Sequence, residues 1–122
     1  MLQDEYALRL APYNIARIKL ERLARDRAFI HWVYVPPAFR GRGLGQVLLD
    51  RVLADADREG VHLALVAKAC AKLGAKPMGQ NPLEGWYAQN GFIRRGRAAD
   101  GGMKMSRRPF DRVASRRHKR VA

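Results

Sequence analysis

The 122-residue chain has the length of one small domain, and 48% of its residues are hydrophobic, enough for a compact core. Its formal charge is +13, from 24 lysines and arginines against 11 aspartates and glutamates. The single cysteine excludes an intramolecular disulfide and disfavours a cysteine-based zinc site, so we expect no metal. The N-terminus lacks the pattern of a signal peptide and no run is long enough to span a bilayer. We therefore expect a cytoplasmic protein without membrane contact.

The positive charge is concentrated at the C-terminus. Residues 107–122 hold seven basic side chains and one acidic, or six of the thirteen excess charges, and offer little to bury. We expect a folded domain over residues 1–107 and a basic tail over residues 108–122. The tail would either contact an acidic partner or a nucleic acid, or serve only as a solubilising end.

Three strands are predicted in the first third of the chain. Residues 5–12 alternate as a half-exposed strand does, whereas residues 14–24 fit a strand or a helical face equally by periodicity. A turn, "ARDR", and the run "AFIHWVYV" at residues 28–35 follow, and this aromatic and β-branched run is typical of a strand. We therefore expect an antiparallel meander, ended by two prolines.

A helix is predicted shortly after these prolines. Apolar positions recur at helical spacing, and Gly60 suits the C-terminal end of the helix. Residues 61–69 predict the next strand, so the order strand, helix, strand implies a right-handed crossover and a parallel pair. The residues expected on one face of the helix are Leu44, Val47, Leu48, Val52 and Ala56.

A second helix is predicted from Asn81, which would cap it. Pro82 would take its first position, and Glu84 would reach back to the cap as in a capping box. Gly91 would end the helix. The last strands are expected over residues 92–97 and 101–107. The fold class is therefore α/β (α+β), with a mixed sheet, an antiparallel N-terminal meander and two main helices.

The glycine-rich turn "RGRGLG", residues 40–45, lies directly before the first helix. A helix N-terminus presents unpaired N–H groups and a partial positive charge, which favour an anion. Glycines let an anion approach the backbone, and the two arginines add bidentate donors. The pattern is neither a dinucleotide-type G-x-G-x-x-G nor a nucleoside-triphosphate loop. By itself the turn leaves a phosphate site and a plain tight turn both open.

Two motifs together resemble those of the GNAT superfamily of acetyl-CoA-dependent N-acetyltransferases. The first is Arg/Gln-x-x-Gly-x-Gly/Ala between a strand ending in Val-x-Pro and a helix. The second is an aromatic-Tyr pair shortly before Gly-Phe. The resemblance covers about residues 14–107. The matching residues are Val35, Pro37, Arg40, Gly43 and Gly45 in the first motif, and Trp86, Tyr87, Gly91 and Phe92 in the second.

The resemblance implies direct attack of a primary amine on acetyl-CoA, the cosubstrate, in a ternary complex. It implies a central parallel strand pair that splays to admit CoA, with backbone N–H groups of Val33 and Val35 holding the thioester and pantetheine. Tyr87 would protonate the leaving thiolate, since a phenol with an ordinary pKa near 10 keeps its proton at neutral pH. The residues expected at the pyrophosphate are Arg40, Gly41, Arg42, Gly43, Leu44, Gly45 and Gln46.

The chain departs from the family pattern on the acceptor side. Family members usually open with a strand and two helices, and these N-terminal helices are reduced or missing here. Asn81 also stands one position closer to Tyr87 than the family pattern has it.

His31 is the candidate general base. Because it alternates with Trp32, we expect it on the strand face of Val33 and Val35, and an imidazole exchanges protons near neutral pH. A structural histidine is the alternative, and Glu21 on the neighbouring strand is the second candidate base.

Two other functions are considered. A nucleic-acid-binding module would use the positive charge, with Trp32, Tyr34 and Trp86 as stacking platforms. A degenerate acetyltransferase-like subunit would bind CoA without activity. For the enzyme, the acceptor would be a small-molecule or protein amine, and the basic charge favours an acidic carrier over a polycation. Homodimerisation is left open.

Overall fold

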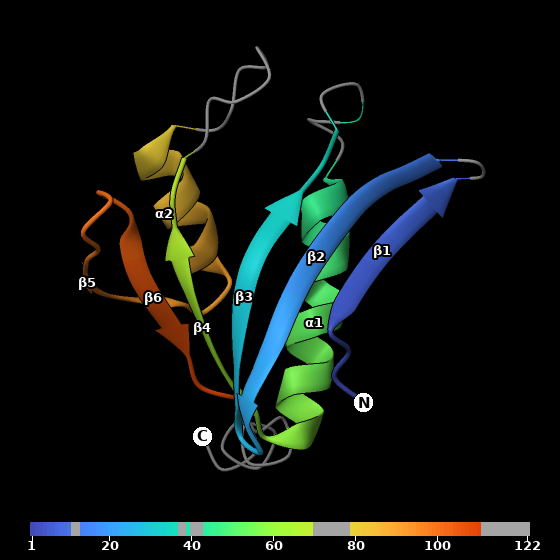
Figure 1. Ribbon diagram of the computed structural model, residues 1–122, viewed down its shortest axis with the longest axis horizontal. Coiled ribbons are helices and arrows are strands. Elements are labelled where there is room, and N and C mark those ends of the chain that lie inside the picture. The colour runs from blue at the N-terminus through green and yellow to red at the C-terminus, as the bar shows by residue number, and fades with distance from the viewer. Residues whose placement is uncertain (11–12, 37–38, 40–42, 70–78, 111–122) are drawn as a thin grey trace, which may run out of the picture.

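The computed structural model describes residues 1–10, 13–36, 39, 43–69 and 79–110. The chain runs through one six-stranded sheet and two helices, and the sheet has the strand order β1-β2-β3-β4-β6-β5 (Figure 1). The elements are β1 (Glu5–Leu10), β2 (Tyr13–Ala24), β3 (Arg27–Tyr34), α1 (Leu44–Glu59), β4 (His62–Ala67), α2 (Gln80–Gln89), β5 (Ile93–Arg97) and β6 (Met103–Arg107).

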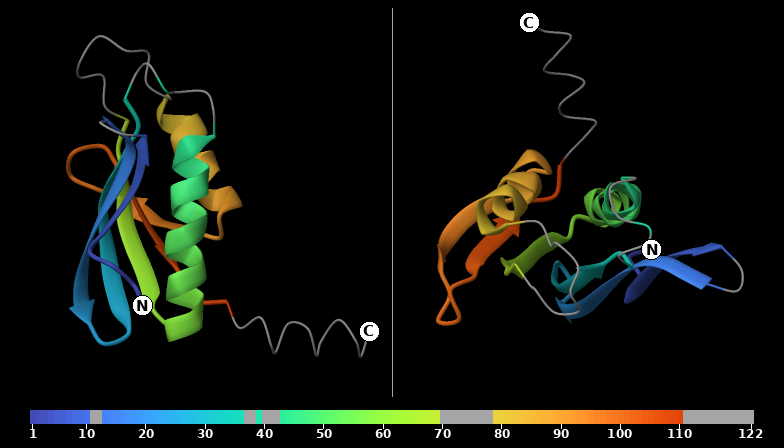
Figure 2. Two further views of the ribbon diagram at one scale, coloured as in Figure 1. Left: turned by 90° about the vertical axis from the view of Figure 1, so that its right-hand side faces the viewer. Right: turned by 90° about the horizontal axis from the view of Figure 1, so that it is seen from above.

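Both helices pack on the same face of the sheet, so the described molecule has two layers (Figure 2). Helix α1 covers β1 and β2, and α2 covers β4 and β5. The core lies between these layers. Its largest fully buried side chains are Ile18, Leu48, Leu49, Val52, Val61, Leu63 and Met105. We call the opposite face of the sheet, which no described helix covers, the open face.

The predicted meander is confirmed. Strand β2 pairs antiparallel with both β1 and β3, and its alternate side chains Ala16, Ile18 and Leu20 are buried. This alternation settles residues 14–24 as a strand, since a helix would bury a different set. The predicted crossover is confirmed as well, because β3 and β4 pair in parallel on either side of α1 in the chain.

Helix α1 buries a stripe rotated slightly from the predicted one. Gly43 precedes the helix with a φ of 73°, and Gly60 follows it with a φ of 70°, as predicted for its end. Val47 was expected on the buried face, but it is 43% exposed. Leu49 and Leu53 take its place, because the stripe that meets the sheet is Leu48, Leu49, Val52, Leu53 and Ala56.

Helix α2 begins two residues earlier than predicted, because Pro82 was expected at its first position. Its first residue is Gln80, and the first helical hydrogen bond runs from the Leu83 N–H to the Gly79 carbonyl. Asn81 therefore lies inside the helix and does not cap it. Pro82 is the third helical residue, still within the first turn, where a missing N–H breaks no helical bond. Glu84 forms no capping box, because its carboxylate is buried and paired elsewhere.

The last two strands are confirmed as an antiparallel pair, with β6 lying between β4 and β5. Residues 108–110 belong to no helix or strand, and the predicted tail from residue 111 onward lies outside the described residues. Over the part of the chain that the structure describes, no helix is long and apolar enough to cross a membrane.

Candidate functional site

The sheet opens between β3 and β4. These strands pair in parallel only from Arg27 opposite His62 to Ile30 opposite Leu65. Beyond that point β3 continues against β2 to Tyr34, while β4 continues against β6 to Ala67. The predicted splay of the central parallel pair is thus present, and Figure 1 shows the two strands diverging toward their C-terminal ends.

A β-bulge in β3 lies where the strands separate. Leu20 of β2 is opposite Ile30, but the preceding residue, Lys19, is opposite Trp32, so His31 is the extra residue. A bulge bends its strand and increases its twist, which turns the rest of β3 away from β4. The bulge also inverts the order in which side chains alternate between the two faces of the sheet. Ile30, before the bulge, and Val33, three residues later, therefore both face the helices and the core.

The prediction that His31 lies on the same face of the strand as Val33 and Val35 is therefore wrong. His31 and Trp32 are both exposed, and the His31 ring packs edge-on against Phe29 at 5.1 Å between centroids. The prediction assumed strict alternation from His31 to Val35, and the bulge adds one residue to that count. His31 consequently lies on the open face, whereas Val33 and Val35 pack on the side of the helices.

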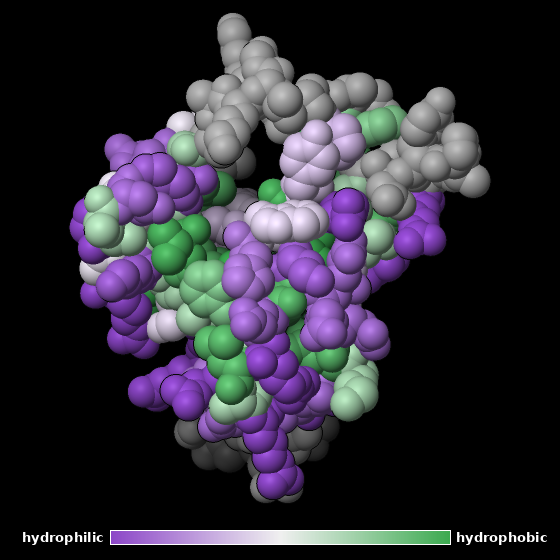
Figure 3. Space-filling view, in the orientation of Figure 1, coloured by the Kyte–Doolittle hydropathy of each residue, from purple (hydrophilic) through white to green (hydrophobic). Residues whose placement is uncertain are grey.

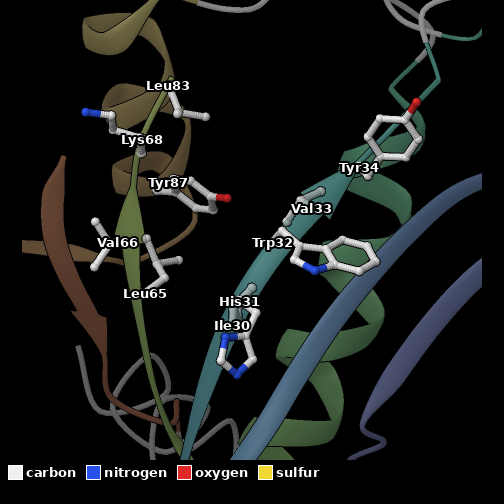
Figure 4. A pocket seen from close by; sticks show the side chains of 10 residues that line it. All are labelled: Ile30, His31, Trp32, Val33, Tyr34, Leu65, Val66, Lys68, Leu83 and Tyr87. Carbon is white, nitrogen blue, oxygen red and sulfur yellow. The ribbon is translucent and has the colours of Figure 1, made fainter. Parts of the chain in front are cut away.

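A cavity of about 540 Å³ occupies the opening (Figure 4). Its walls come from β3, from the C-terminal half of β4 and the residue after it, and from α2. Most of the lining is apolar, with the phenol of Tyr87 and the imidazole of His31 among its polar groups. The lining residues are Ile30, His31, Trp32, Val33, Tyr34, Leu65, Val66, Lys68, Leu83 and Tyr87.

Tyr87 reaches this cavity from α2. Its ring packs against Trp86 and Phe92, with centroids 4.8 and 5.6 Å away, and the residue is only 7% exposed. Figure 4 shows its hydroxyl directed across the opening toward β3. Burial raises the pKa of Tyr87 to about 12, because the phenolate would lose its hydration. The phenol therefore keeps its proton throughout the neutral range.

The two candidate bases form a pair. His31 Nε2 lies 3.1 Å from the Glu21 carboxylate, across the β2–β3 ladder on the open face. A carboxylate is an acceptor, so Nε2 is the ring nitrogen that donates a hydrogen bond to Glu21. The sequence suggested His31 and Glu21 as alternatives, and the structure brings them together.

The start of α1 lies beside the end of β3. Backbone N–H groups of Leu44, Gly45 and Gln46 precede the first helical hydrogen bond, which Val47 donates to the Gly43 carbonyl. A side chain at Gly45 would meet Val33 and Val35 at 3.7–3.8 Å. The described part of the predicted phosphate turn therefore presents N–H groups that the helical hydrogen bonds do not use, which suits an anion. Arg40, Gly41 and Arg42 lie outside the described residues.

The side chain of Gln46 connects the two helices. Its oxygen accepts a hydrogen bond from Trp86 Nε1 at 2.7 Å, and its nitrogen donates to the Asn90 side chain at 2.6 Å. Gln46 was predicted to contact cofactor, and this bonding leaves that role to its backbone N–H. Trp86 was considered as a stacking platform, but it is half-buried between the helices, unlike Trp32 and Tyr34, which are 41% and 37% exposed.

A buried polar network on α2 was missed at the sequence level. The Gln80 side chain accepts from the Ala69 N–H and donates to the Ala67 carbonyl, both at 2.9 Å. It also donates to Glu84 at 2.7 Å. Glu84, 3% exposed, accepts from Arg94 and Arg97 at 3.1 Å each. The hydrogen bond from Gln80, aided by both arginines, lowers the pKa of Glu84.

The open face carries a mixed apolar and basic surface. Phe29, Ala64, Ser106 and Ile93 pair in one row across β3, β4, β6 and β5. Figure 3 shows apolar side chains gathered at the centre of this face and hydrophilic ones around them. At the β2–β3 end, the Arg17 guanidinium lies over the Trp32 ring, 5.4 Å from its centroid.

Comparisons with known proteins agree with this geometry. A model of the acetyltransferase (GNAT) family matches residues 8–78, more than half of the chain. The fold is similar to that of PaiA N-acetyltransferase from Thermoplasma acidophilum, solved with coenzyme A, with a TM-score of 0.64 and 18% identity over 86% of this chain and 61% of that one. No curated protein matches the chain in sequence.

Two further solved structures resemble the chain. One is the ribosomal-protein-S18-alanine N-acetyltransferase from Escherichia coli, with a TM-score of 0.63 and 18% identity over 86% of this chain and 68% of that one. The other is Ard1 from Thermoplasma volcanium, with a TM-score of 0.62 and 18% identity over 83% of this chain and 67% of that one. The chain thus spans 61% to 68% of the three structures named.

Proposed function

This chain belongs to the acetyltransferase (GNAT) family, and we propose that it transfers an acetyl group from acetyl-CoA to a primary amine. The observation that carries the proposal is the opening between β3 and β4. It holds a protonated phenol, the hydroxyl of Tyr87, opposite β3 and next to a helix N-terminus with N–H groups that the helical hydrogen bonds do not use. These are the groups that acyl transfer from an anionic thioester requires.

The described residues suit acetyl-CoA as the cosubstrate. Its pyrophosphate would take the N–H groups at the start of α1, where an added Cβ at Gly43 would have no atom within 4 Å. Its thioester would enter the opening beside Val33 and Val35, which lie beyond the last β3–β4 pair. The backbone N–H of Val33 is a candidate donor to the developing oxyanion.

In the reaction the acceptor nitrogen loses two protons and the leaving thiolate gains one. His31, oriented by Glu21, would accept a proton from the acceptor ammonium, and the free amine would attack the thioester carbonyl to form a C–N bond. The nitrogen of the tetrahedral intermediate loses its second proton to solvent water, and the intermediate collapses with loss of the C–S bond. The leaving thiolate takes its proton from Tyr87, whose raised pKa guarantees that the proton is present. Water re-protonates the phenolate after product release.

The acceptor we propose is an amine on a neutral or acidic molecule. Among the described lining residues the ionisable groups are His31, Tyr34, Lys68 and Tyr87, none of them a carboxylate. Such a wall would repel a polycation. The Escherichia coli neighbour is named for a protein alanine, so a peptide N-terminus is one acceptor to test.

Native mass spectrometry with acetyl-CoA, followed by a free-thiol assay over a panel of amines and peptides, tests the proposal. We expect a one-to-one complex per chain and thiol release that depends on the acceptor. Desulfo-CoA serves as the control ligand, because it keeps the phosphates and lacks the reactive sulfur. Binding without acceptor-dependent release would favour the inactive CoA-binding subunit, and the absence of binding would refute the acetyl-CoA site.

The exposed rings of Trp32 and Tyr34 favour one second candidate, binding of single-stranded nucleic acid on the open face. Exposed aromatics beside arginine and lysine provide stacking and phosphate contacts. Fluorescence anisotropy with a labelled oligonucleotide at two salt concentrations tests this candidate, because electrostatic binding weakens steeply with salt. Affinity unchanged in a Trp32→Ala variant would argue against the open face as the binding surface.

A further inference from the structure

We infer that Glu84 is a positioning residue for the reaction: together with Gln80 it anchors α2 to the ends of β4 and β5 and thereby sets where the Tyr87 hydroxyl stands in the opening. The inference rests on the proposed function, in which Tyr87 is the acid. It concerns residues that touch neither the thioester nor the phosphates in that mechanism.

The spacing of these residues places them on one side of the helix. Gln80, Glu84 and Tyr87 occupy positions i, i+4 and i+7, which form one stripe of an α-helix. Glu84 and Tyr87 are the two buried residues of α2. If the contacts of Glu84 loosened, the helix could shift along its axis or rotate about it. Tyr87 would then move with the helix.

Gln80 attaches the first turn of α2 to the end of β4. The ladder between β4 and β6 ends at Ala67 opposite Met103, so the next residues of the chain lack a strand partner in β6. The Gln80 side-chain amide takes that place, because it offers one acceptor to the Ala69 N–H and one donor to the Ala67 carbonyl. This end of β4 forms one wall of the opening.

Glu84 connects Gln80 with β5. One carboxylate oxygen accepts from Arg94, and the other accepts from Gln80 and Arg97. The second hydrogen of the Gln80 amide nitrogen is the one that Glu84 receives, so the donors of this amide are fully used. Because the carboxylate is 3% exposed, its charge depends on these partners and not on water.

The position of Tyr87, in the C-terminal half of α2, depends on the anchors at both ends of the helix as well as on ring contacts. Ring contacts with Trp86 and Phe92 hold its side chain, and Trp86 lies on α2 itself. Hydrogen bonds anchor the C-terminal half of α2 through Gln46 of α1, and the Glu84 network anchors its N-terminal half. Removing the Glu84 charge would free that half to tilt, and small misplacements of an acid lower the rate steeply.

The test is Glu84→Gln, which keeps the size of the side chain and removes the charge. We expect kcat for acetyl transfer to fall by about tenfold. The Kd for acetyl-CoA should stay within about twofold, since the phosphates bind at α1. Hydrogen exchange of the α2 amides without ligand should be faster. Asp55→Asn is the matched control, because Asp55 bonds Tyr6 of β1 from α1 and has no bond to α2.

A double-mutant cycle with Tyr87→Phe separates positioning from stability. If Glu84 acts through the phenol, Glu84→Gln should lower kcat little further once the hydroxyl is absent. Equal losses of kcat in both backgrounds would overturn the inference and leave the acetyltransferase proposal intact. The assay uses the amine or peptide from the panel that the wild-type protein acetylates. No thiol release by the wild type, with any acceptor, would refute the proposed function itself.

Arg94→Gln provides a second route to the same answer. Arg94 is half-exposed and its loss leaves Glu84 paired with Gln80 and Arg97, so this variant should fold even where Glu84→Gln does not. It should lower kcat in the same direction by a smaller factor, again only while Tyr87 is present. An Arg94→Gln variant with faster α2 exchange but wild-type kcat would contradict the role proposed for the network.

Discussion

The two ends of the β3–β4 pair differ in what holds them together. At the N-terminal end, four residue pairs from Arg27 opposite His62 to Ile30 opposite Leu65 close the sheet over buried apolar side chains. At the C-terminal end, past the bulge at His31, the same strands part, and the Gln80 side chain bonds the end of β4. A buried apolar side chain can pack against any apolar neighbour. Each hydrogen bond at the open end instead needs one particular donor and one particular acceptor.

This difference separates stability from function. The closed end contributes stability by removing apolar area from water, and small local shifts there change little else. The open end exposes a cavity, so its atoms are held by directional contacts from α1 and α2. Substitutions at the closed end should therefore affect unfolding, and those at the open end should affect binding or turnover.

The largest effect is expected at the closed end, for Leu63→Ala. Leu63 is 1% exposed and pairs with Ala28, so its truncation leaves a cavity and should lower the free energy of unfolding by about 2–5 kcal/mol. Urea denaturation measures the loss. Ile93→Ala, at an exposed position of β5, should change the free energy by less than about 0.5 kcal/mol. Equal losses in the two variants would contradict the comparison.

At the open end, Tyr87→Phe removes the acid and keeps the ring. We expect kcat to fall by about 10²-fold, because general acid catalysis contributes on that scale. The affinity for acetyl-CoA should change little. Steady-state kinetics with a thiol readout and calorimetric titration give the two quantities. Undiminished kcat would leave the thiolate to be protonated by water and would deprive Tyr87 of its role.

Binding at the helix start is tested with a pair of glycines. Gly43 and Gly60 flank α1 with φ values of 73° and 70°, and neither has an atom within 4 Å of an added Cβ. Gly43→Val and Gly60→Val therefore impose similar backbone strain at opposite ends of the helix. Only Gly43→Val should weaken acetyl-CoA binding, by about tenfold, or about 1.4 kcal/mol. Calorimetry that finds equal affinities in the two folded variants would remove the phosphate site.

The Glu84 network predicts a pH-dependent stability difference. The pKa of Glu84 is lowered from its ordinary value of 4.5 in the folded protein, so the charged network stabilises the fold above that value. This contribution is lost as the pH falls through the folded pKa. The wild type should thus exceed Glu84→Gln in stability near neutral pH, and the difference should shrink below pH 4.5. A pH-independent difference in urea midpoints would show that the charge of Glu84 is not responsible.

The smallest effect is expected for removal of the basic tail. The Phe110 N–H donates to Asp57, which also pairs with Arg107, so the last described residues still belong to the fold. A chain ending at Phe110 should keep its acetyl-CoA affinity, and its free energy of unfolding should change by less than about 0.5 kcal/mol. Loss of binding in calorimetry would make the tail part of the site.

Local patterns were sufficient for most elements but not for their details. The turn and strong strand after residues 14–24 and the glycine after α1 predicted a strand and a helix end correctly. The face of His31 was wrong, because a bulge depends on the register with β2 and not on β3 alone. The start of α2 differed by two residues, because Gln80 bonds to the end of β4, a contact distant in the chain.

The network around Glu84 shows most clearly what sequence reasoning could not reach. Spacing from Asn81 suggested a capping box, since both residues are near each other in the chain. The ion-pair partners of Glu84 are Arg94 and Arg97 of β5. These arginines lie next to α2 only when β5 has paired into the sheet. A helical stripe of Gln80, Glu84 and Tyr87 was visible in the sequence, but nothing local indicated that the stripe is buried.

By itself the sequence determined the types and order of the elements, the glycine turn before α1 and the membership in an acetyltransferase family, because these depend on periodicity and on short motifs. Only the tertiary structure decided which residues share the opening. The bulge at His31, the pairing of His31 with Glu21 and the anchoring of α2 through Glu84 each join residues that are 10 or more positions apart in the chain. Such contacts follow from strand register and from the burial of charge, and neither can be counted along a single segment.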